Sequence, residues 1–113
     1  MSVLIDWEQL DMIADGFTPD FVEIYREFVS EMPTLLSQLR SKVLAGDAAA
    51  AAKVAHQIKG SAANFGFVGV SRAAATLEQG AKAGSLADAT ALLGDATVSF
   101  EKAVAEVRAL RNA

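Results

Sequence analysis

The sequence has no cysteine, and it has no run of about 18 apolar residues that could span a membrane. Its start also lacks a basic segment followed by an apolar stretch and a small-residue cleavage site. These absences argue against a disulfide framework, a transmembrane helix and a secretion signal. We therefore expect a soluble, cytoplasmic protein.

Basic residues are too few and too scattered to form a broad positive surface. Ten lysines and arginines are dispersed among fourteen aspartates and glutamates, and the formal net charge is −4. Such a surface cannot neutralise many nucleic-acid phosphates or anionic lipids. We expect neither nucleic acid nor a membrane as a partner.

Motifs that bind ATP are also missing. The chain has no GxxxxGK[ST] loop, no GxGxxG turn after a strand, and no acidic cluster arranged as an evident Mg²⁺ site. Ser61 near His56 is too weak a pair to indicate a hydrolase or transferase. We expect no cofactor of its own and no autonomous ATP-dependent kinase activity, so the chain is not predicted to be an enzyme.

The composition favours a single helical domain. Hydrophobic residues make up 52% of the 113 residues, alanine runs unbroken from Ala48 to Ala52, and only two prolines occur. This length and composition suit one globular core. We expect one domain over residues 1–113 and, by default, a monomer.

Hydrophobic periodicity and capping residues predict five helices. Pro33 is expected to bend the second helix, and Ser85 to cap the fifth. The predicted segments are a brief helix from Asp6 to Asp15, a long one from Thr18 to Ala45, a third from Asp47 to Gly66, a fourth from Val68 to Ala83 and a fifth from Ser85 to Arg111.

Each long segment carries one apolar stripe, which includes Ile24 in the second helix and Leu110 in the fifth. Short connections between helices favour antiparallel neighbours. The predicted fold class is all-α, an antiparallel up-down four-helix bundle with a short additional N-terminal helix.

His56 is the only histidine and is predicted to face solvent. It lies two positions from both Val54 and Ile58, hence roughly 160° around the helix from each of these buried-stripe residues. Lys53 and Lys59, three residues before and after it, lie on neighbouring parts of the same face. An anion is therefore expected to be attracted to this face.

Gly60 lies one turn beyond His56 on the same face and costs a helix about 1 kcal/mol relative to alanine. One interpretation is steric access, because the missing side chain leaves the imidazole uncovered. The alternative is close helix packing at Gly60. Taken alone, a surface histidine between lysines can also be a simple solvated face.

The segment from His56 to Phe67, HQIKGSAANFGF, resembles the H-x-[LI]-K-G-[SGA] signature of histidine phosphotransfer domains. The predicted helix order is also similar to that family's bundle. The resemblance implies that His56 is phosphorylated, that Lys59 is the nearby cation, that Gly60 makes space and that Ser61 is a polar neighbour.

Members of this family carry a Glu or Gln on the next helix that bonds to the histidine ring. Glu78 falls at the corresponding spacing, with Gln79 as the fallback. Glu78 is about 100° from the apolar line of its own helix, so it could reach sideways to the preceding one. The alternative is a solvent-facing acid that pairs with Lys82 at i+4.

The resemblance identifies the partners as response-regulator receiver domains and a hybrid histidine kinase, with Mg²⁺ bound in the receiver. We expect the docking surface to surround His56 and to include Ile13 and Phe67 as apolar contacts and Lys53 as a rim contact. Core burial is the alternative for Phe67. The rival functions are a phosphorylation-independent adaptor and the phosphate-accepting domain of a larger histidine kinase.

Overall fold

The computed structural model describes residues 4–113, and every regular element in this range is an α-helix. The all-helical prediction is thereby confirmed for the described residues, while residue 1, the predicted start of the domain, lies outside them. The helices are α1 (Trp7–Ala14), α2 (Pro19–Leu44), α3 (Ala48–Asn64), α4 (Val68–Lys82) and α5 (Ala89–Arg111).

Three helices begin where a side-chain oxygen accepts a free backbone N–H of the first turn. Asp6 Oδ1 accepts from Gln9 N at 3.1 Å before α1, and Asp47 Oδ1 accepts from Ala50 N at 3.1 Å before α3. Before α2, which opens with a proline, Thr18 Oγ1 accepts from Phe21 N at 3.3 Å. These predicted starts are confirmed.

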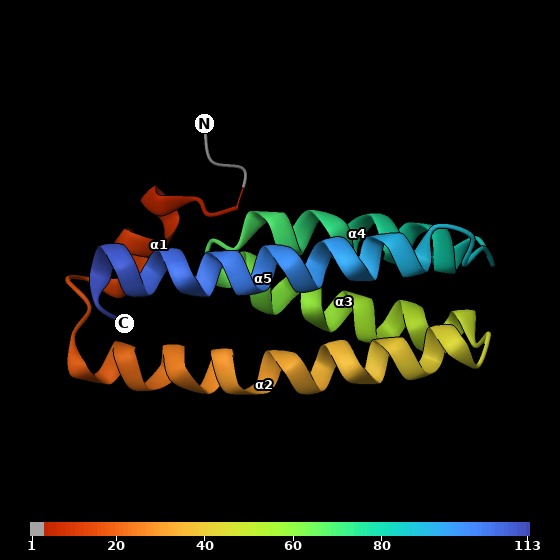
Figure 1. Ribbon diagram of the computed structural model, residues 1–113, viewed down its shortest axis with the longest axis horizontal. Coiled ribbons are helices and arrows are strands. Elements are labelled where there is room, and N and C mark those ends of the chain that lie inside the picture. The colour runs from red at the N-terminus through yellow and green to blue at the C-terminus, as the bar shows by residue number, and fades with distance from the viewer. Residues whose placement is uncertain (1–3) are drawn as a thin grey trace.

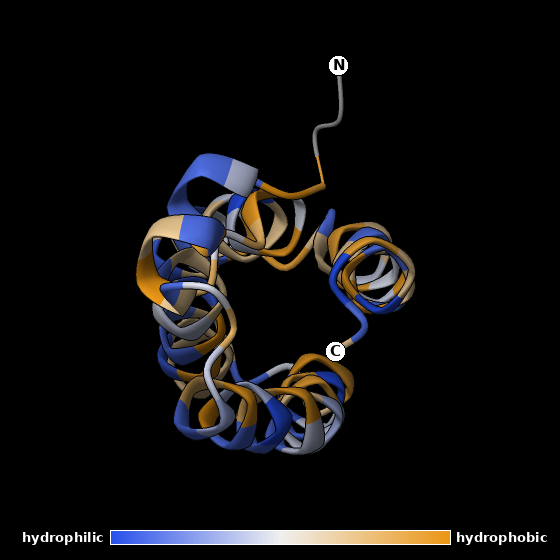
Figure 2. Cartoon of the chain, turned by 90° about the vertical axis from the view of Figure 1, so that its left-hand side faces the viewer, coloured by the Kyte–Doolittle hydropathy of each residue, from blue (hydrophilic) through white to orange (hydrophobic). Residues whose placement is uncertain are grey.

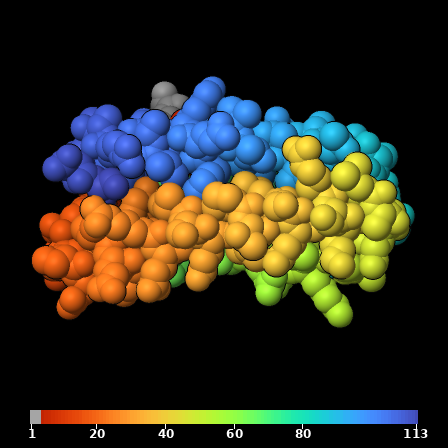
Figure 3. Space-filling view, turned by 60° about the horizontal axis from the view of Figure 1, so that its bottom comes forward, coloured from red at the N-terminus to blue at the C-terminus, as the bar shows by residue number. Residues whose placement is uncertain are grey.

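The four long helices lie side by side, and the chain alternates in direction from each to the next (Figure 1). The contacts run from α2 to α3, α3 to α4, α4 to α5 and α5 back to α2, so the helices surround one core. Figure 2 looks along the bundle and shows this ring arrangement. Figure 3 shows α2 and α5 side by side along one face.

Two kinds of packing fill this core. Aromatic rings gather at one end, where Phe28 stacks on Phe65 with centroids 4.4 Å apart and meets Phe67 edge-on at 5.1 Å. α3 and α4 contact each other, and their buried residues are mostly alanines, which allow two helices to approach closely. Those alanines are Ala51, Ala52, Ala55 and Ala62 on α3 and Ala73, Ala74 and Ala81 on α4.

α1 lies at one end of the bundle and is held there by backbone and side-chain contacts. Asp6 N donates to Gly66 O at 2.7 Å, where Gly66 has a φ of +73°. Arg111, the last residue of α5, donates to Asp11 Oδ1 and Oδ2 at 2.9 and 2.7 Å and lies over the Trp7 ring. These bonds attach the N-terminal segment to the turn between α3 and α4 and to the end of α5.

The fifth helix begins later than predicted. Ser85 N donates to Gly80 O, so Ser85 belongs to the turn that ends α4, and its Oγ accepts from Ala87 N within that connection. The prediction that Ser85 caps the fifth helix is therefore wrong, and α5 starts at Ala89.

Two residues of the predicted apolar stripes are exposed. Ile24 reaches solvent because α2 packs mainly on α3 and α5, which cover a narrower stripe than predicted. Leu110 lies in the last turn of α5, beyond the last buried residue, Val107. Pro33 lies inside α2 without ending it. Among residues 4–113, no helix combines the length and the apolar character needed to cross a membrane.

Candidate functional site

His56 projects from the middle of α3, and its side chain is 65% exposed. The prediction that the only histidine faces outward is confirmed. Its Nδ1 lies 2.9 Å from Oε2 of Glu78, which comes from α4. The outer edge of the ring, with Nε2, therefore remains open to other molecules.

Glu78 is the only charged residue that is buried in the part of the chain that the structure describes. Its side chain is only 4% exposed, although it holds a largely exposed imidazole. The alanines between α3 and α4 bring the two backbones close together, so a short carboxylate arm reaches from one helix to the other. The alternative of a solvent-facing Glu78 is wrong, although the expected pair with Lys82 is present.

The buried carboxylate of Glu78 contacts two lysines in addition to His56. Lys59 Nζ lies 2.8 Å from Oε1, and Lys82 Nζ lies 3.1 Å from Oε2. The pKa of Glu78 is lowered to about 2, mainly by the hydrogen bond from Lys59, then by those from Lys82 and His56, while burial acts in the opposite direction. Glu78 is thus ionised at neutral pH.

An ionised carboxylate can only accept hydrogen bonds, so the 2.9 Å contact requires a proton on His56 Nδ1. In the neutral imidazole this tautomer leaves the lone pair on Nε2, the ring nitrogen that Glu78 does not contact. The site therefore presents an oriented nucleophile at the protein surface.

Gly60 has open space where a side chain would stand. A Cβ built at Gly60 meets no heavy atom within 4 Å apart from its chain neighbours and the nearby backbone of its own helix. Close packing of a neighbouring helix therefore does not explain this glycine, and steric access beside His56 stays a prediction.

Ser71 adds a contact that the sequence did not predict. Its Oγ, on α4, donates to the backbone carbonyl of Lys59 on α3 at 3.1 Å. This bond links α3 to α4 about two helical turns from Glu78. A small hydroxyl at a helix interface is too common a feature to be singled out from sequence alone.

The remaining predicted site residues differ in how far they are exposed. Lys53 is exposed and lines a shallow pocket next to His56, and it forms no ion pair within residues 4–113. Ser61 is half-buried one residue beyond Gly60, and Ile13 is half-buried on α1, packed against the core.

Phe67 does not belong to the surface. It is fully buried, within the aromatic cluster formed with Phe28 and Phe100. The prediction that Phe67 contacts a partner is therefore wrong, because its ring completes the core below the turn between α3 and α4.

The chemistry of this site rests on an imidazole, a carboxylate and lysines. Within residues 4–113, no three His, Asp or Glu side chains gather closely enough to hold a metal ion. The arrangement can present Nε2 to an electrophile and can place positive charge near an incoming anion.

Comparisons with known proteins show which proteins this chain is similar to. A family model described as "Hpt domain" matches residues 23–112, a range that includes His56, Lys59 and Glu78 but not α1. A comparison with curated proteins found no significant match. Among solved structures, the chain is similar to the crystal structure of histidine-containing phosphotransfer protein B (HptB) from Pseudomonas aeruginosa PAO1. That alignment has 28% sequence identity and a TM-score of 0.85, and it covers 99% of this chain and 94% of that chain.

Proposed function

The chain belongs to the Hpt domain family, and from this premise we propose that it is a phosphocarrier of a two-component phosphorelay. In this proposal His56 accepts a phosphoryl group from a phospho-aspartyl receiver domain and passes it to another receiver. The observation that carries the proposal is the 2.9 Å contact between His56 Nδ1 and an ionised, buried Glu78.

The transfer follows from the tautomer that Glu78 imposes. The Nε2 lone pair attacks phosphorus, the bond from phosphorus to the aspartyl oxygen breaks, and its electron pair stays on the receiver's carboxylate. The proton on Nδ1 remains in place, so the ring becomes cationic. Glu78 Oε2, 2.9 Å away, stabilises that developing charge.

The other residues have supporting roles in the proposal. Lys59 keeps Glu78 ionised through Oε1 and adds positive potential near the phosphoryl group. Gly60 leaves room for the receiver's active site, while Lys53, Ser61 and Ile13 contribute to the docking surface. The Mg²⁺ that neutralises the transferring oxygens would be bound by the receiver, not by this chain.

The proposed carrier is a monomeric, cytoplasmic domain over residues 1–113, built as an antiparallel up-down four-helix bundle with the additional helix α1. It has no kinase activity of its own and receives its phosphoryl group from a hybrid histidine kinase through that kinase's receiver. The same exposed imidazole allows forward and reverse transfer, so the direction of net flow depends on its partners.

The proposal is tested by incubating the protein with each phosphorylated receiver domain of the source organism. At least one receiver should lose its label to the wild-type chain, and mass spectrometry should place the phosphoryl group on His56. His56→Gln is the matched control, since it keeps a polar side chain and should accept nothing. Absence of transfer from every receiver would refute the proposal, and full cellular output from His56→Gln would favour an adaptor instead.

A further inference from the structure

Lys82 and Lys59 contact different oxygens of the same carboxylate. Lys59 Nζ lies 2.8 Å from Oε1, whereas Lys82 Nζ lies 3.1 Å from Oε2, the oxygen that also accepts from His56 Nδ1. Lys82 and the imidazole therefore share one acceptor atom. A change in the charge of the ring must alter the attraction between Lys82 and that atom.

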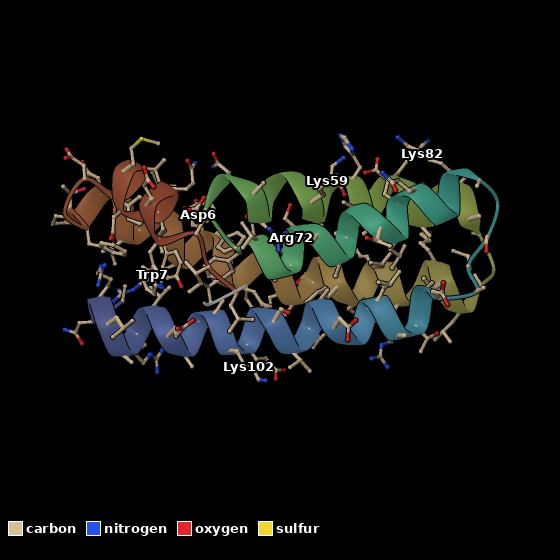
Figure 4. All side chains as sticks on the ribbon, turned by 90° about the horizontal axis from the view of Figure 1, so that it is seen from above. Asp6, Trp7, Lys59, Arg72, Lys82 and Lys102 are labelled. Carbon is tan, nitrogen blue, oxygen red and sulfur yellow. The ribbon has the colours of Figure 1, made fainter. Side chains whose placement is uncertain are left out.

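Lys82 also has the freedom to move. It is the last residue of α4, and its side chain is 66% exposed, compared with 36% for Lys59. A shallow pocket beside the imidazole is lined by Ala52, Lys53, His56, Gln57, Glu78 and Lys82, but not by Lys59. Figure 4 shows Lys59 and Lys82 on the same side of the molecule. A lysine ammonium on a flexible stem can shift by a few ångströms at little cost.

Phosphorylation would change the charge on both sides of the ring. A neutral imidazole that is attacked through Nε2 and keeps its Nδ1 proton becomes cationic, so it can balance the charge on Glu78 Oε2 without Lys82. The attached phosphoryl group carries up to two negative charges. Both changes favour movement of the Lys82 ammonium from Oε2 to the phosphoryl oxygens.

We propose that Lys82 is an exchangeable cation, bound to Glu78 Oε2 in the resting protein and to the phosphoryl group once His56 carries one. This inference rests on the proposed function. It assigns to Lys82 a role that Lys59 cannot take, because Lys59 is bound to the other oxygen and continues to hold Glu78 when Lys82 leaves.

The test measures the equilibrium constant for phosphoryl exchange between the chain and a receiver that labels His56. This equilibrium constant compares the free proteins before and after transfer, so contacts made only within the transient complex of chain and receiver do not affect it. If Lys82 only helped the receiver to dock, its substitution would leave the equilibrium constant unchanged. Lys82→Gln should shift the equilibrium toward the phosphorylated receiver by about threefold to tenfold. Lys82→Arg should restore it to within about twofold of wild type.

Lys102 is the matched control, because it is an exposed lysine on α5 at the opposite side of the molecule (Figure 4). Lys102→Gln removes the same charge and should leave the constant unchanged. A second measurement follows the ¹³Cε signals of labelled lysines when phosphoramidate phosphorylates His56 without any protein partner. The signal of Lys82 should shift on phosphorylation and that of Lys102 should not, while circular dichroism checks that each variant is folded.

The outcomes separate this inference from the proposed function. If wild-type His56 accepts no phosphoryl group from any receiver or from phosphoramidate, both are overturned. If His56 is labelled but Lys82→Gln leaves the equilibrium constant unchanged, only the exchange of Lys82 is overturned. An unmoved Lys82 signal in the phosphorylated protein likewise overturns the exchange of Lys82 and leaves the proposed function standing.

Discussion

Glu78 Oε2 lies 2.9 Å from Nδ1 of His56, and the carboxylate is buried while the imidazole is exposed. This relationship separates two tasks, because the buried group orients the ring and the exposed group remains available to a partner.

Glu78→Ala is expected to change the tautomer of His56. With the acceptor removed, the proton is no longer held on Nδ1 and the Nε2–H form becomes populated, which blocks the nucleophile. ¹⁵N NMR of the imidazole at a pH where the ring is neutral should show mainly Nδ1–H in the wild type and a larger Nε2–H fraction in the variant. The rate of phosphorylation by phosphoramidate should fall by about tenfold or more. An unchanged tautomer ratio would contradict the orienting role of Glu78.

The stability of the protein should depend on pH through Glu78. The pKa of this group is lowered to about 2 from its ordinary value of 4.5, so its stabilising effect is complete above about pH 4.5 and is lost as the pH falls toward 2. Loss of the carboxylate in Glu78→Gln should cost roughly 1–3 kcal/mol at pH 7, discounted for the exposed lysine partners.

Urea unfolding of the wild type and of Glu78→Gln at several pH values between 7 and 2 measures this effect. The difference in free energy of unfolding between the two proteins should shrink as the pH falls below about 4.5. Glu101→Gln is the control, since it removes an exposed acid of α5 that forms no ion pair in the described chain. A difference that stays constant with pH would show that the Glu78 charge does not stabilise the fold.

Gly60→Ala is expected to stabilise the protein and to slow transfer from a receiver. The added Cβ meets no heavy atom within 4 Å, so the helix gains about 0.5–1 kcal/mol from the better propensity of alanine. The same methyl group would lie one helical turn from His56 on the same face of α3, where a receiver has to approach, and should slow receiver-dependent phosphorylation on the order of tenfold, because a small misplacement of reactants is costly.

Gly94 on α5 provides the matched control, since a Cβ there also meets nothing within 4 Å. Thermal unfolding should show a similar gain in stability for Gly94→Ala, while stopped-flow measurement of transfer should show no change. Equal transfer rates for both alanine variants would refute the steric explanation of Gly60.

Gly66→Ala is expected to loosen the N-terminal segment. Its Cβ would lie 2.7 Å from the backbone oxygen of Asp6, and the residue has a φ of +73°, which alanine tolerates poorly. Gly84 has a similar φ of +82° but open space at its Cβ, so Gly84→Ala isolates the conformational cost of about 1 kcal/mol.

The free energy of unfolding of Gly66→Ala should fall by about 1–2 kcal/mol more than that of Gly84→Ala, because Asp6 must move as well. Hydrogen exchange should show reduced protection of the α1 amides in Gly66→Ala alone. Equal destabilisation by the two substitutions would mean that the contact with Asp6 contributes nothing.

Local sequence signals predicted the helices well where side chain and backbone act within one turn. Asp6, Thr18 and Asp47 begin helices because each oxygen reaches an N–H three residues away, whatever the rest of the fold does. Ser85 misled the prediction, because a serine before an apolar stripe can equally bond within a turn.

The apolar stripes were less reliable at their edges. The periodicity of Ile24 and Leu110 is helical, but their exposure depends on how much of each helix the neighbouring helices cover. Phe67 shows the opposite error, because it was predicted to contact a partner at the surface and is buried. It follows a turn, yet its ring packs in the aromatic cluster with Phe28 and Phe100. Burial of this kind depends on packing between segments distant in the sequence.

The helical character of the chain and the outward direction of His56 follow from the sequence alone, because helix propensity and helical phase are properties of a single segment. The burial of Glu78 and its contacts with His56, Lys59 and Lys82 depend instead on how the helices pack together. These contacts require a particular separation of α3 and α4. It is set by the alanines between them and by the bond from Ser71 to the backbone of Lys59, and it determines which atoms a carboxylate can reach.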